Sequence, residues 1–282
     1  MKQKNITVKE HFIPQCYLKG FSPDKKRVYQ YDMLNWKTYP LTNTNEICCE
    51  DYLYEFKDGN GDIVIPNTIE NALINYEGAL KKLLIDITKK SHDVRNFHTR
   101  TFLSTKEKVL LIGLMSMQVM RMPDFIKIGE DTAKQMFKIE QYQARNFSIL
   151  TNLPIYLKLG SDDKTLFSLV ANWFTDMSFM IFRSESHNIY TGDKPIYLYG
   201  KDKNNPDIDV KPEKVIYPLT SNLVLYMLPI NKYPEYRNRL IPITPRVLKE
   251  VHKSIAGTSK RFLYSFCPLT EEEIQEIREA RE

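Results

Sequence analysis

The sequence predicts an α+β fold with a mainly helical core and a small antiparallel sheet in the C-terminal half. The first observation is a set of long helical patterns between residues 60 and 185. The second is a change of period after residue 186, where short β-branched and aromatic runs are broken by Gly, Pro and Asn. Because helices precede strands and no long linker divides them, we expect one α+β domain over 1–282, with a helical part at 60–185 and a sheet-containing part at 186–282.

One segment is expected to form the central helix. It begins at Ser104, which forms a capping-box pattern with Glu107, and runs to about Met122. From Val109 onward it is apolar nearly all round, which predicts burial on every side. Pro123 then ends or kinks it. Further helices are expected at 67–90, 124–147, 163–183 and from about 270 onward.

Short runs of β-branched and aromatic residues predict strands. They occur at 27–31, 51–56, 187–200, 213–219 and 222–229. The last three runs are expected to form the small antiparallel sheet. No repeat of 20 to 50 residues is visible in the sequence, which argues against a solenoid or a propeller.

Composition and motifs exclude several classes of protein. The chain is 42% hydrophobic and 27% charged, as in ordinary globular proteins. Its longest apolar run is far short of the roughly 20 residues of a membrane helix, and its first residues do not form a signal peptide. The four cysteines have no disulfide or zinc spacing, so we expect a cytoplasmic protein without a membrane partner. Phosphate-binding glycine motifs, GxSxG and HExxH do not occur in the sequence.

The positive charge is unevenly distributed. Residues 1–37 and 232–261 are rich in Lys and Arg, whereas the C-terminal segment is rich in Glu. The two basic stretches would attract phosphate backbones if they shared one face, which makes nucleic acid a candidate partner. The alternative is an ordinary solvated surface that the acidic C-terminal segment partly neutralises.

Two pairs of polar residues lie on the expected helices. Glu70 and Glu77, seven residues apart, point in nearly the same direction at the margin of an apolar stripe. Such carboxylates can bind a divalent cation or transfer protons, but they can also be edge glutamates in helix ion pairs. Gln118 and Arg121 share one face of the central helix. A buried arginine needs a carboxylate or an anionic ligand, so Arg121 either pairs with one of the glutamates or binds an anion in a cleft.

Two further places carry candidate functional residues. Asp193 and Lys194 lie between two strand-like runs, where they form either a plain turn or a catalytic acid and base. His11 lies near the N-terminus, and its ordinary pKa near neutrality makes it a candidate proton carrier, although a structural histidine is the alternative. The candidate catalytic residues are thus His11, Glu70, Glu77 and Asp193, and the candidate substrate-binding residues are Gln118, Arg121 and Lys194.

Several short segments, each present once, follow one another in a characteristic order along the chain. They are HFIPQCYLKGF at 11–21, ICCEDYLY at 47–54, the glutamates at 70 and 77, a Gln-x-x-Arg-x-Pro pattern at 118–123, TGDKPI at 191–196 and YPLTSN at 217–222. Together they resemble the uncharacterised, mainly bacterial family named domain of unknown function 4238. Gly192 stands where that family commonly has Ser, and Lys194 where it has Asn. The resemblance implies a shared fold and a polar cluster, without an established activity.

Two functional hypotheses follow, from different classes. The first is a metal-dependent, nuclease-like enzyme acting on nucleic acid, in which the His, Glu and Asp residues hold a divalent ion such as Mg²⁺ or Mn²⁺ and activate water. Arg121 or Lys194 would then stabilise the developing phosphate charge. The second is a non-catalytic binding or regulatory protein, in which the same residues form a buried structural network. Clustering around an open pocket favours the enzyme, and a closed, paired network favours the binding protein.

Overall fold

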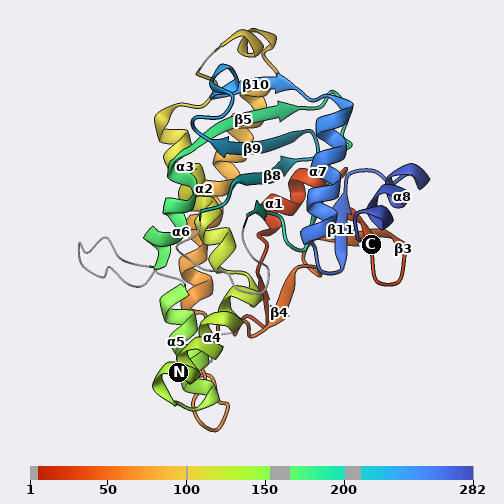
Figure 1. Ribbon diagram of the computed structural model, residues 1–282. Coiled ribbons are helices and arrows are strands. Elements are labelled where there is room, and N and C mark those ends of the chain that lie inside the picture. Colours follow the sequence, from red (N-terminus) through yellow and green to blue (C-terminus); the bar gives the residue numbers. More distant parts are fainter. Residues whose placement is uncertain (1–5, 100, 153–165, 201–210, 282) are drawn as a thin grey trace.

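The structure is a computed structural model that describes residues 6–99, 101–152, 166–200 and 211–281 (Figure 1). Within these ranges the helices are α1 (Gln15–Leu18), α2 (Thr68–Ser91), α3 (Thr105–Met120), α4 (Pro123–Phe137), α5 (Gln141–Asn152), α6 (Leu166–Thr175), α7 (Pro245–Thr258) and α8 (Glu271–Glu279). The strands are β1 (Lys9–His11), β2 (Arg27–Asp32), β3 (Lys37–Asn43), β4 (Cys49–Asp51), β5 (Met177–Arg183), β6 (Thr191–Gly192), β7 (Tyr197–Tyr199), β8 (Lys214–Thr220), β9 (Leu223–Pro229), β10 (Arg239–Pro242) and β11 (Phe262–Ser265).

A five-stranded sheet in the order β10-β5-β9-β8-β7 forms the middle of the molecule. Its neighbouring strands are antiparallel except for the parallel pair of β10 and β5. A four-stranded antiparallel sheet has the order β3-β2-β11-β6, and β1 pairs with β4 in a two-stranded ribbon. In this topology β7 is an edge strand of the largest sheet.

The expectation of one small sheet in the C-terminal half is wrong. The described residues form eight α-helices and three sheets of two, four and five strands that are spread along the chain. The four-stranded sheet joins segments from both ends, since Asp32 of β2 lies opposite Phe262 of β11. Local patterning shows which segments are extended, but it carries no information on which distant segments pair, so the N-terminal strands could not be assigned to a sheet.

The prediction of a helix over 163–183 is also wrong for the second half of that segment. Residues 153–165 lie outside the described ranges, α6 covers Leu166–Thr175, and Met177–Arg183 forms strand β5. Every second side chain of β5 packs on one face of the sheet, as Phe179 does, and Met180 packs on the other. A run in which nearly all residues are apolar satisfies both the helical and the strand period, so periodicity alone could not decide.

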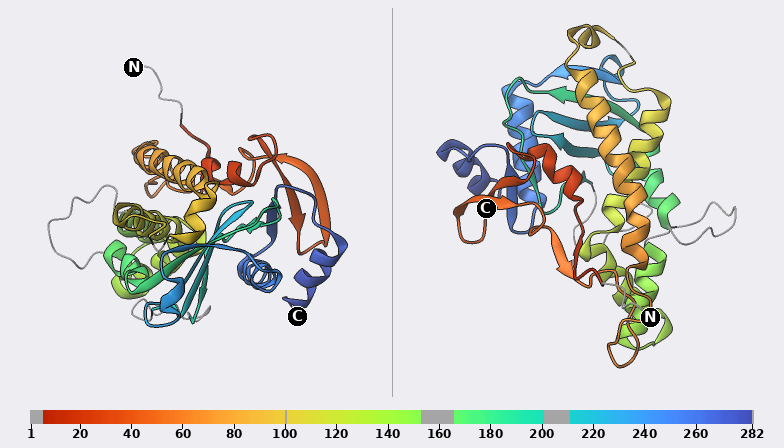
Figure 2. Two further views of the ribbon diagram at one scale, coloured as in Figure 1. Left: turned by 90° about the horizontal axis from the view of Figure 1, so that it is seen from above. Right: turned by 180° about the vertical axis from the view of Figure 1, so that it is seen from behind.

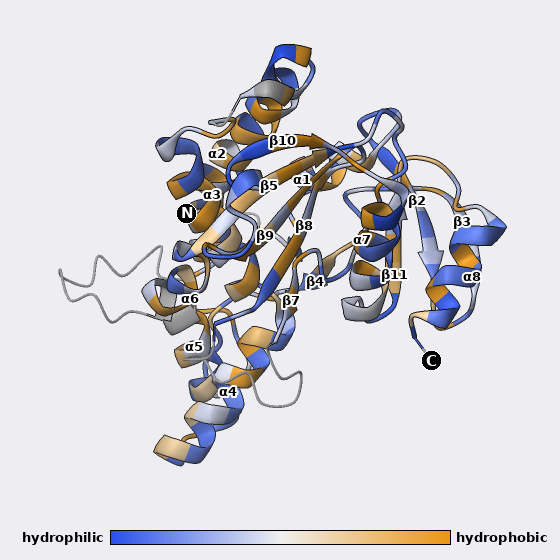
Figure 3. Cartoon of the chain, turned by 45° about the horizontal axis from the view of Figure 1, so that its top comes forward, coloured by the Kyte–Doolittle hydropathy of each residue, from blue (hydrophilic) through white to orange (hydrophobic). Residues whose placement is uncertain are grey.

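Helices cover both faces of the five-stranded sheet. On one face, Val215 and Tyr217 of β8 belong to a core cluster that includes residues of α2 and α3. On the other face, Ile216 packs in a cluster with Val251 and Ile255 of α7. Figures 1 and 2 show this order of helix, sheet and helix, and Figure 3 shows the hydrophobic colour of the central strands. The strand period of two therefore divides the core into two layers.

The central helix is confirmed in α3. Ser104 and Glu107 form the expected capping box. The expected core residues are buried, with exposed fractions of 0% for Leu111, 4% for Leu114 and 0% for Met115. The helix is not buried on every side at its start, because Val109 is 63% exposed.

Pro123 separates α3 from α4, as expected, and the two helices are bent by 64° at this point. No single helix in the described ranges is long and apolar enough to cross a membrane, although α3 and α4 meet the length and composition criteria as a bent pair. The bend directs α4 away from the sheet, where it packs against α5 (Figure 1). The first turn of α4 consequently stands beside the edge strand β7.

Candidate functional site

Arg121, at the C-terminal end of α3, is the centre of a buried polar network. Its guanidinium is fully buried and pairs with Glu77 of α2 at an N–O distance of 3.2 Å. The same group donates a hydrogen bond to the backbone carbonyl of His11. The rings of Tyr54 and Tyr76 lie 6.0 Å and 5.6 Å from the guanidinium carbon. The expected contact between Arg121 and a glutamate of α2 is thus present.

Gln118, one helical turn before Arg121, holds the same N-terminal segment. Its Nε2 donates to the carbonyl of Phe12 at 2.9 Å. The Tyr54 hydroxyl, which has a single hydrogen, lies 3.0 Å from the carbonyl oxygen of Arg121 and 3.3 Å from that of His11 and donates to one of them at a time. The spacing of Gln118 and Arg121 therefore lets one helix provide side-chain donors to two consecutive backbone carbonyls, those of His11 and Phe12. We call Arg121, Gln118, Glu77 and Tyr54 the brace, because they fasten the N-terminal segment to α2 and α3.

Three glutamates form an acidic cluster next to the brace: Glu10, Glu55 and Glu70. Each has one buried carboxylate oxygen without a hydrogen-bond partner among the described residues. The second oxygen of Glu10 accepts from the backbone N–H of Tyr54 at 2.7 Å, and that of Glu55 from Asn67 at 2.7 Å. Burial and the neighbouring charges of Glu55 and Glu70 raise the pKa of Glu10 to about 7. Burial likewise raises the pKa of Glu55 and of Glu70, so it favours the protonated form of all three carboxyls.

The imidazole of His11 is 8% exposed and lies in the same region. Burial and the positive charge of Arg121 lower its pKa, which favours the neutral ring at pH 7. Its Nε2 is buried and has no partner within the described part of the chain. His11 therefore contributes its carbonyl to the brace, while its ring stays inside the protein.

The residues that were expected to bind Mg²⁺ or Mn²⁺ do not form a ligand set. The described ranges contain no group of three or more His, Cys, Asp or Glu side chains placed to hold a metal ion. Glu77 is paired with Arg121, and Asp193 is bound to backbone N–H groups elsewhere. These divalent ions need several oxygen ligands arranged around one point, so the described residues do not fit them.

Asp193 fixes the turn that precedes β11. Its carboxylate accepts hydrogen bonds from the backbone N–H groups of Lys260 at 2.7 Å, Arg261 at 2.8 Å and Phe262 at 3.0 Å. Gly192 is required beside it, because a Cβ atom there would overlap the Ser259 hydroxyl. This close approach accounts for glycine at the position where the resembling motif has Ser. Asp193 is thus joined to the chain at 260–262, not to the glutamates of α2.

We expect Asp193→Asn to lower the free energy of unfolding by roughly 1 kcal/mol. The amide keeps one oxygen for the backbone N–H groups of 260–262 but loses the second oxygen and the negative charge. Urea denaturation at pH 7 measures the change, with Asp131→Asn on the surface of α4 as the control. An Asp193→Asn protein as stable as wild type would contradict this structural role.

Lys194 connects the same turn to α4. Asp124, in the first turn of α4, pairs with Lys194 through one carboxylate oxygen and with Lys260 through the other. Burial opposes ionisation of Asp124, but the two lysines outweigh it and hold the pKa of this carboxyl below its ordinary value. One carboxylate therefore meets two ammonium groups, which leaves an excess positive charge at this point.

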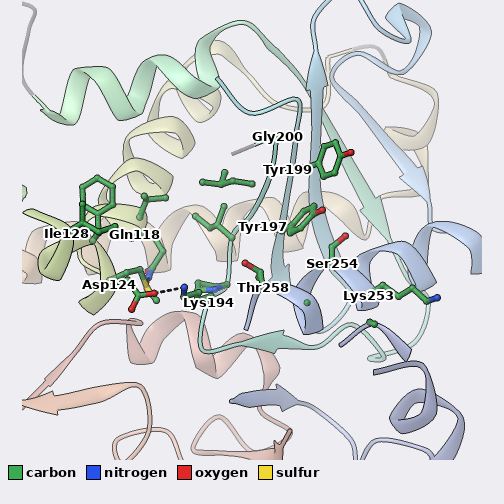
Figure 4. Close-up of a pocket in the computed structure, with 18 residues that line it drawn as sticks. Gln118, Asp124, Ile128, Lys194, Tyr197, Tyr199, Gly200, Lys253, Ser254 and Thr258 are labelled. Atoms are coloured by element: carbon green, nitrogen blue, oxygen red, sulfur yellow. Dashed lines mark hydrogen bonds and ion pairs between the residues drawn. The ribbon is translucent and has the colours of Figure 1, made fainter. Parts of the chain in front are cut away.

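A cavity of about 630 Å³ opens beside these residues, at the edge of the five-stranded sheet where β7 has no further partner among the described strands. One wall comes from the end of α3 and from α4, the other from α7, and residues 194–200 with β7 lie between them (Figure 4). We call this cavity the slot. Its side chains are mainly apolar or aromatic, and its volume is typical of ligand sites. They include Val119, Met122, Phe125, Ile128, Tyr197, Tyr199, Ser254 and Thr258.

The structure divides the predicted site residues into two groups. His11, Glu77, Gln118 and Arg121 meet in or around the brace, and Glu70 lies in the adjoining acidic cluster, whereas Asp193 and Lys194 belong to the turn at the slot. Only Gln118 and Lys194 of these residues line the slot.

Sequence analysis missed α7, which supplies one wall of the slot. A signal for it exists: Thr244 caps the helix by accepting from the N–H of Val247, and Pro245 occupies the first helical position. Apolar residues at helical spacing follow, among them Val251 and Ile255.

Comparison with known proteins identifies one family. The model of the family described as "Protein of unknown function (DUF4238)" matches residues 9–266, a range that includes the brace, the acidic cluster and nearly all of the slot. No curated protein and no solved structure matches the chain.

Proposed function

The chain belongs to the DUF4238 family, whose description assigns no activity, and we propose that it is a non-catalytic binding or regulatory protein that holds its ligand in the slot. The observation that carries this proposal is the slot itself. It is an open, mainly apolar cavity of about 630 Å³ between two helical walls, with the ion-paired Lys194 shortly before β7 and Lys253 on the α7 wall (Figure 4). Apolar cavities with a few polar groups are the usual form of ligand sites.

The arrangement of the polar residues supports binding over metal-dependent nucleic-acid cleavage. A nuclease of the type considered needs a carboxylate set that holds a metal ion and a free base that activates water. Here Glu77 forms an ion pair with Arg121, and the carboxylate of Asp193 accepts hydrogen bonds from backbone N–H groups. The ring of His11 is buried. The brace is therefore understood as a structural network.

The basic stretches also lose much of their attraction for nucleic acid. Lys260 pairs with Asp124, Arg261 with Asp32, and Lys249 with Glu276, so acids accompany bases of the 232–261 segment locally. Paired cations contribute little to the counterion release that drives binding to a phosphate backbone.

We expect Gly257→Leu to abolish binding in the slot. Gly257 lies on α7 and lines the slot, and a Cβ atom there would meet only the Ala280 carbonyl oxygen, at 3.8 Å. The leucine side chain would therefore occupy slot volume without backbone strain. Nile red, an uncharged dye whose fluorescence rises in apolar surroundings, is the probe, and its titration should saturate with wild type and fail with the variant.

Gly78→Leu is the matched control. Gly78 is an exposed helical glycine on α2, with no atom near an added Cβ, so this variant should bind the dye as wild type does. The same preparations are incubated with DNA and RNA in the presence of Mg²⁺, Mn²⁺ or a chelator. Metal-dependent cleavage that Glu77→Gln abolishes, or dye binding that Gly257→Leu leaves unchanged, would overturn the proposal.

A further inference from the structure

The slot has the form of an unfilled strand position in the five-stranded sheet. β7 pairs with β8 along one side, and no described strand pairs with its other side. Side chains alternate across this edge: Ile196 and Leu198 pack in the core cluster that contains α2 and α3, while Tyr197 packs in the cluster that contains α7. The sheet thus reaches the slot with both of its faces already covered.

Both helical layers extend past β7. Val119, Met122 and Phe125 project beyond the edge from the end of α3 and from α4, and Ser254 and Thr258 do so from α7. A further strand would lie about 4.8 Å from β7, between these two walls. Its backbone would pair with β7, and its alternate side chains would face α4 and α7 in turn (Figure 4).

We propose that the ligand of the slot is an extended peptide segment that adds to the edge of β7 as a sixth strand. This inference rests on the proposed binding function and specifies its partner. Strand addition draws affinity from main-chain hydrogen bonds and specificity from alternate side-chain pockets. Branched apolar side chains suit the wall of Val119, Met122 and Phe125, and small or hydroxyl side chains suit that of Ser254 and Gly257.

Charge favours acidic residues in the peptide. Where residue 194 approaches α4, Lys194 and Lys260 share the single carboxylate of Asp124. On the α7 wall, Lys253 has no ion-pair partner among the described residues (Figure 4). The slot therefore carries excess positive charge beside β7 and on α7, which suits acidic residues that flank an apolar and hydroxyl-bearing centre.

A second copy of this chain does not suit the slot. Its own β7 would bring α4 and α7 with it, because these helices flank the strand on both faces, and edge-to-edge pairing would set helix against helix. An isolated extended segment has no such walls. The short strand and Pro195, which lacks an N–H, also limit pairing to a few hydrogen bonds.

The test uses acetylated nonapeptides that alternate valine or leucine with threonine and carry glutamate at both ends. We expect them to displace Nile red from wild type and to slow amide hydrogen exchange at residues 196–199. Two versions are N-methylated on alternate residues, so that each blocks one edge of the peptide. One version should bind at least tenfold more weakly, and the other should bind as the unmodified peptide does.

Matched lysine variants test the charge at the slot. Lys253→Met should weaken the glutamate-ended peptides several-fold and leave glutamine-ended peptides unchanged. Lys249→Met, one turn earlier on α7 and paired with Glu276 outside the slot, should change neither. If Lys253→Met lowered the affinity for glutamate-ended and glutamine-ended peptides equally, the assigned charge preference would be contradicted.

The outcomes separate this inference from the proposed function. If Nile red binds but no peptide displaces it, or if both N-methylated versions bind equally, the strand-addition inference fails while binding in the slot stands. If the dye itself does not bind, both fail. Displacement by oligothymidylate alone, or a dimer in sedimentation that Gly257→Leu dissociates, would also overturn the peptide assignment in favour of nucleic acid or a second copy.

Discussion

Arg121→Ala is expected to lower the free energy of unfolding by about 3–5 kcal/mol. The substitution removes the partner of Glu77 and the donor to the His11 carbonyl, and it leaves the hydroxyl of Tyr54 without its guanidinium neighbour. The Glu77 carboxylate is 32% exposed, so most of the cost comes from the space left by the fully buried arginine and from the buried His11 carbonyl, which loses a donor. Urea denaturation followed by circular dichroism measures the change.

Two variants show whether this cost belongs to the brace. Arg121→Lys keeps the positive charge but has no planar fork, so it cannot serve the Glu77 carboxylate and the His11 carbonyl in the same way, and most of the loss should persist. Arg95→Ala removes an arginine whose side chain is 87% exposed and paired with Asp93 on the surface, and it should leave the stability close to that of wild type. If Arg121→Ala were no more harmful than Arg95→Ala, the brace would have no structural role.

Glu10→Gln is expected to stabilise the protein by roughly 2 kcal/mol at pH 8 and by little at pH 4. The folded state raises the pKa of Glu10 to about 7 through burial and neighbouring carboxylates. Wild type therefore loses stability as pH rises from the ordinary glutamate pKa towards 7, because folding then requires either a proton or a buried charge. Glutamine keeps an acceptor for the Tyr54 N–H and carries no charge at any pH.

Glu50→Gln is the control for this pH dependence. Glu50 lies directly opposite Glu10 in the pairing of β1 with β4, but its side chain is exposed. The two substitutions thus change the net charge equally at neighbouring positions. Unfolding curves at pH 4, 6 and 8 should show a stabilisation that grows with pH for Glu10→Gln alone. A gain that does not depend on pH would mean that folding leaves the pKa of Glu10 unchanged.

Local sequence signals predicted α2, α3, α8 and one contact of the site, whereas α7 was missed and Met177–Arg183 was assigned to a helix although it forms β5. The boundaries of α2 and α3, the capping boxes of α3 and α8, and the contact of Arg121 with Glu77 all follow from spacing along a helix. A polar residue on a buried helix face must find a partner, and the nearest helix with acids at its core margin supplies one.

The slot could not be predicted in the same way. Its walls come from α4 and α7, which are separated by more than a hundred residues, and its position depends on β7 being an edge strand. Strand order in a sheet is a property of non-local pairing. Similarly, Asp193 was expected near the glutamates of α2, but three backbone N–H groups at 260–262 bind it instead. Backbone groups leave no trace in the residue types of a sequence, so such partners are invisible before the fold is known.

The pairing of β2 with β11 has a consequence for biosynthesis. Residues 27–32 leave the ribosome more than two hundred residues before their partners at 262–265. Until then β2 and β3 form a hairpin that lacks its inner neighbour, and two-stranded hairpins have little stability alone. Contacts between such distant segments also slow folding, since the long intervening chain must be ordered before they form. The nascent chain therefore exposes an unpaired strand edge while the intervening residues are synthesised, and such edges are prone to aggregation.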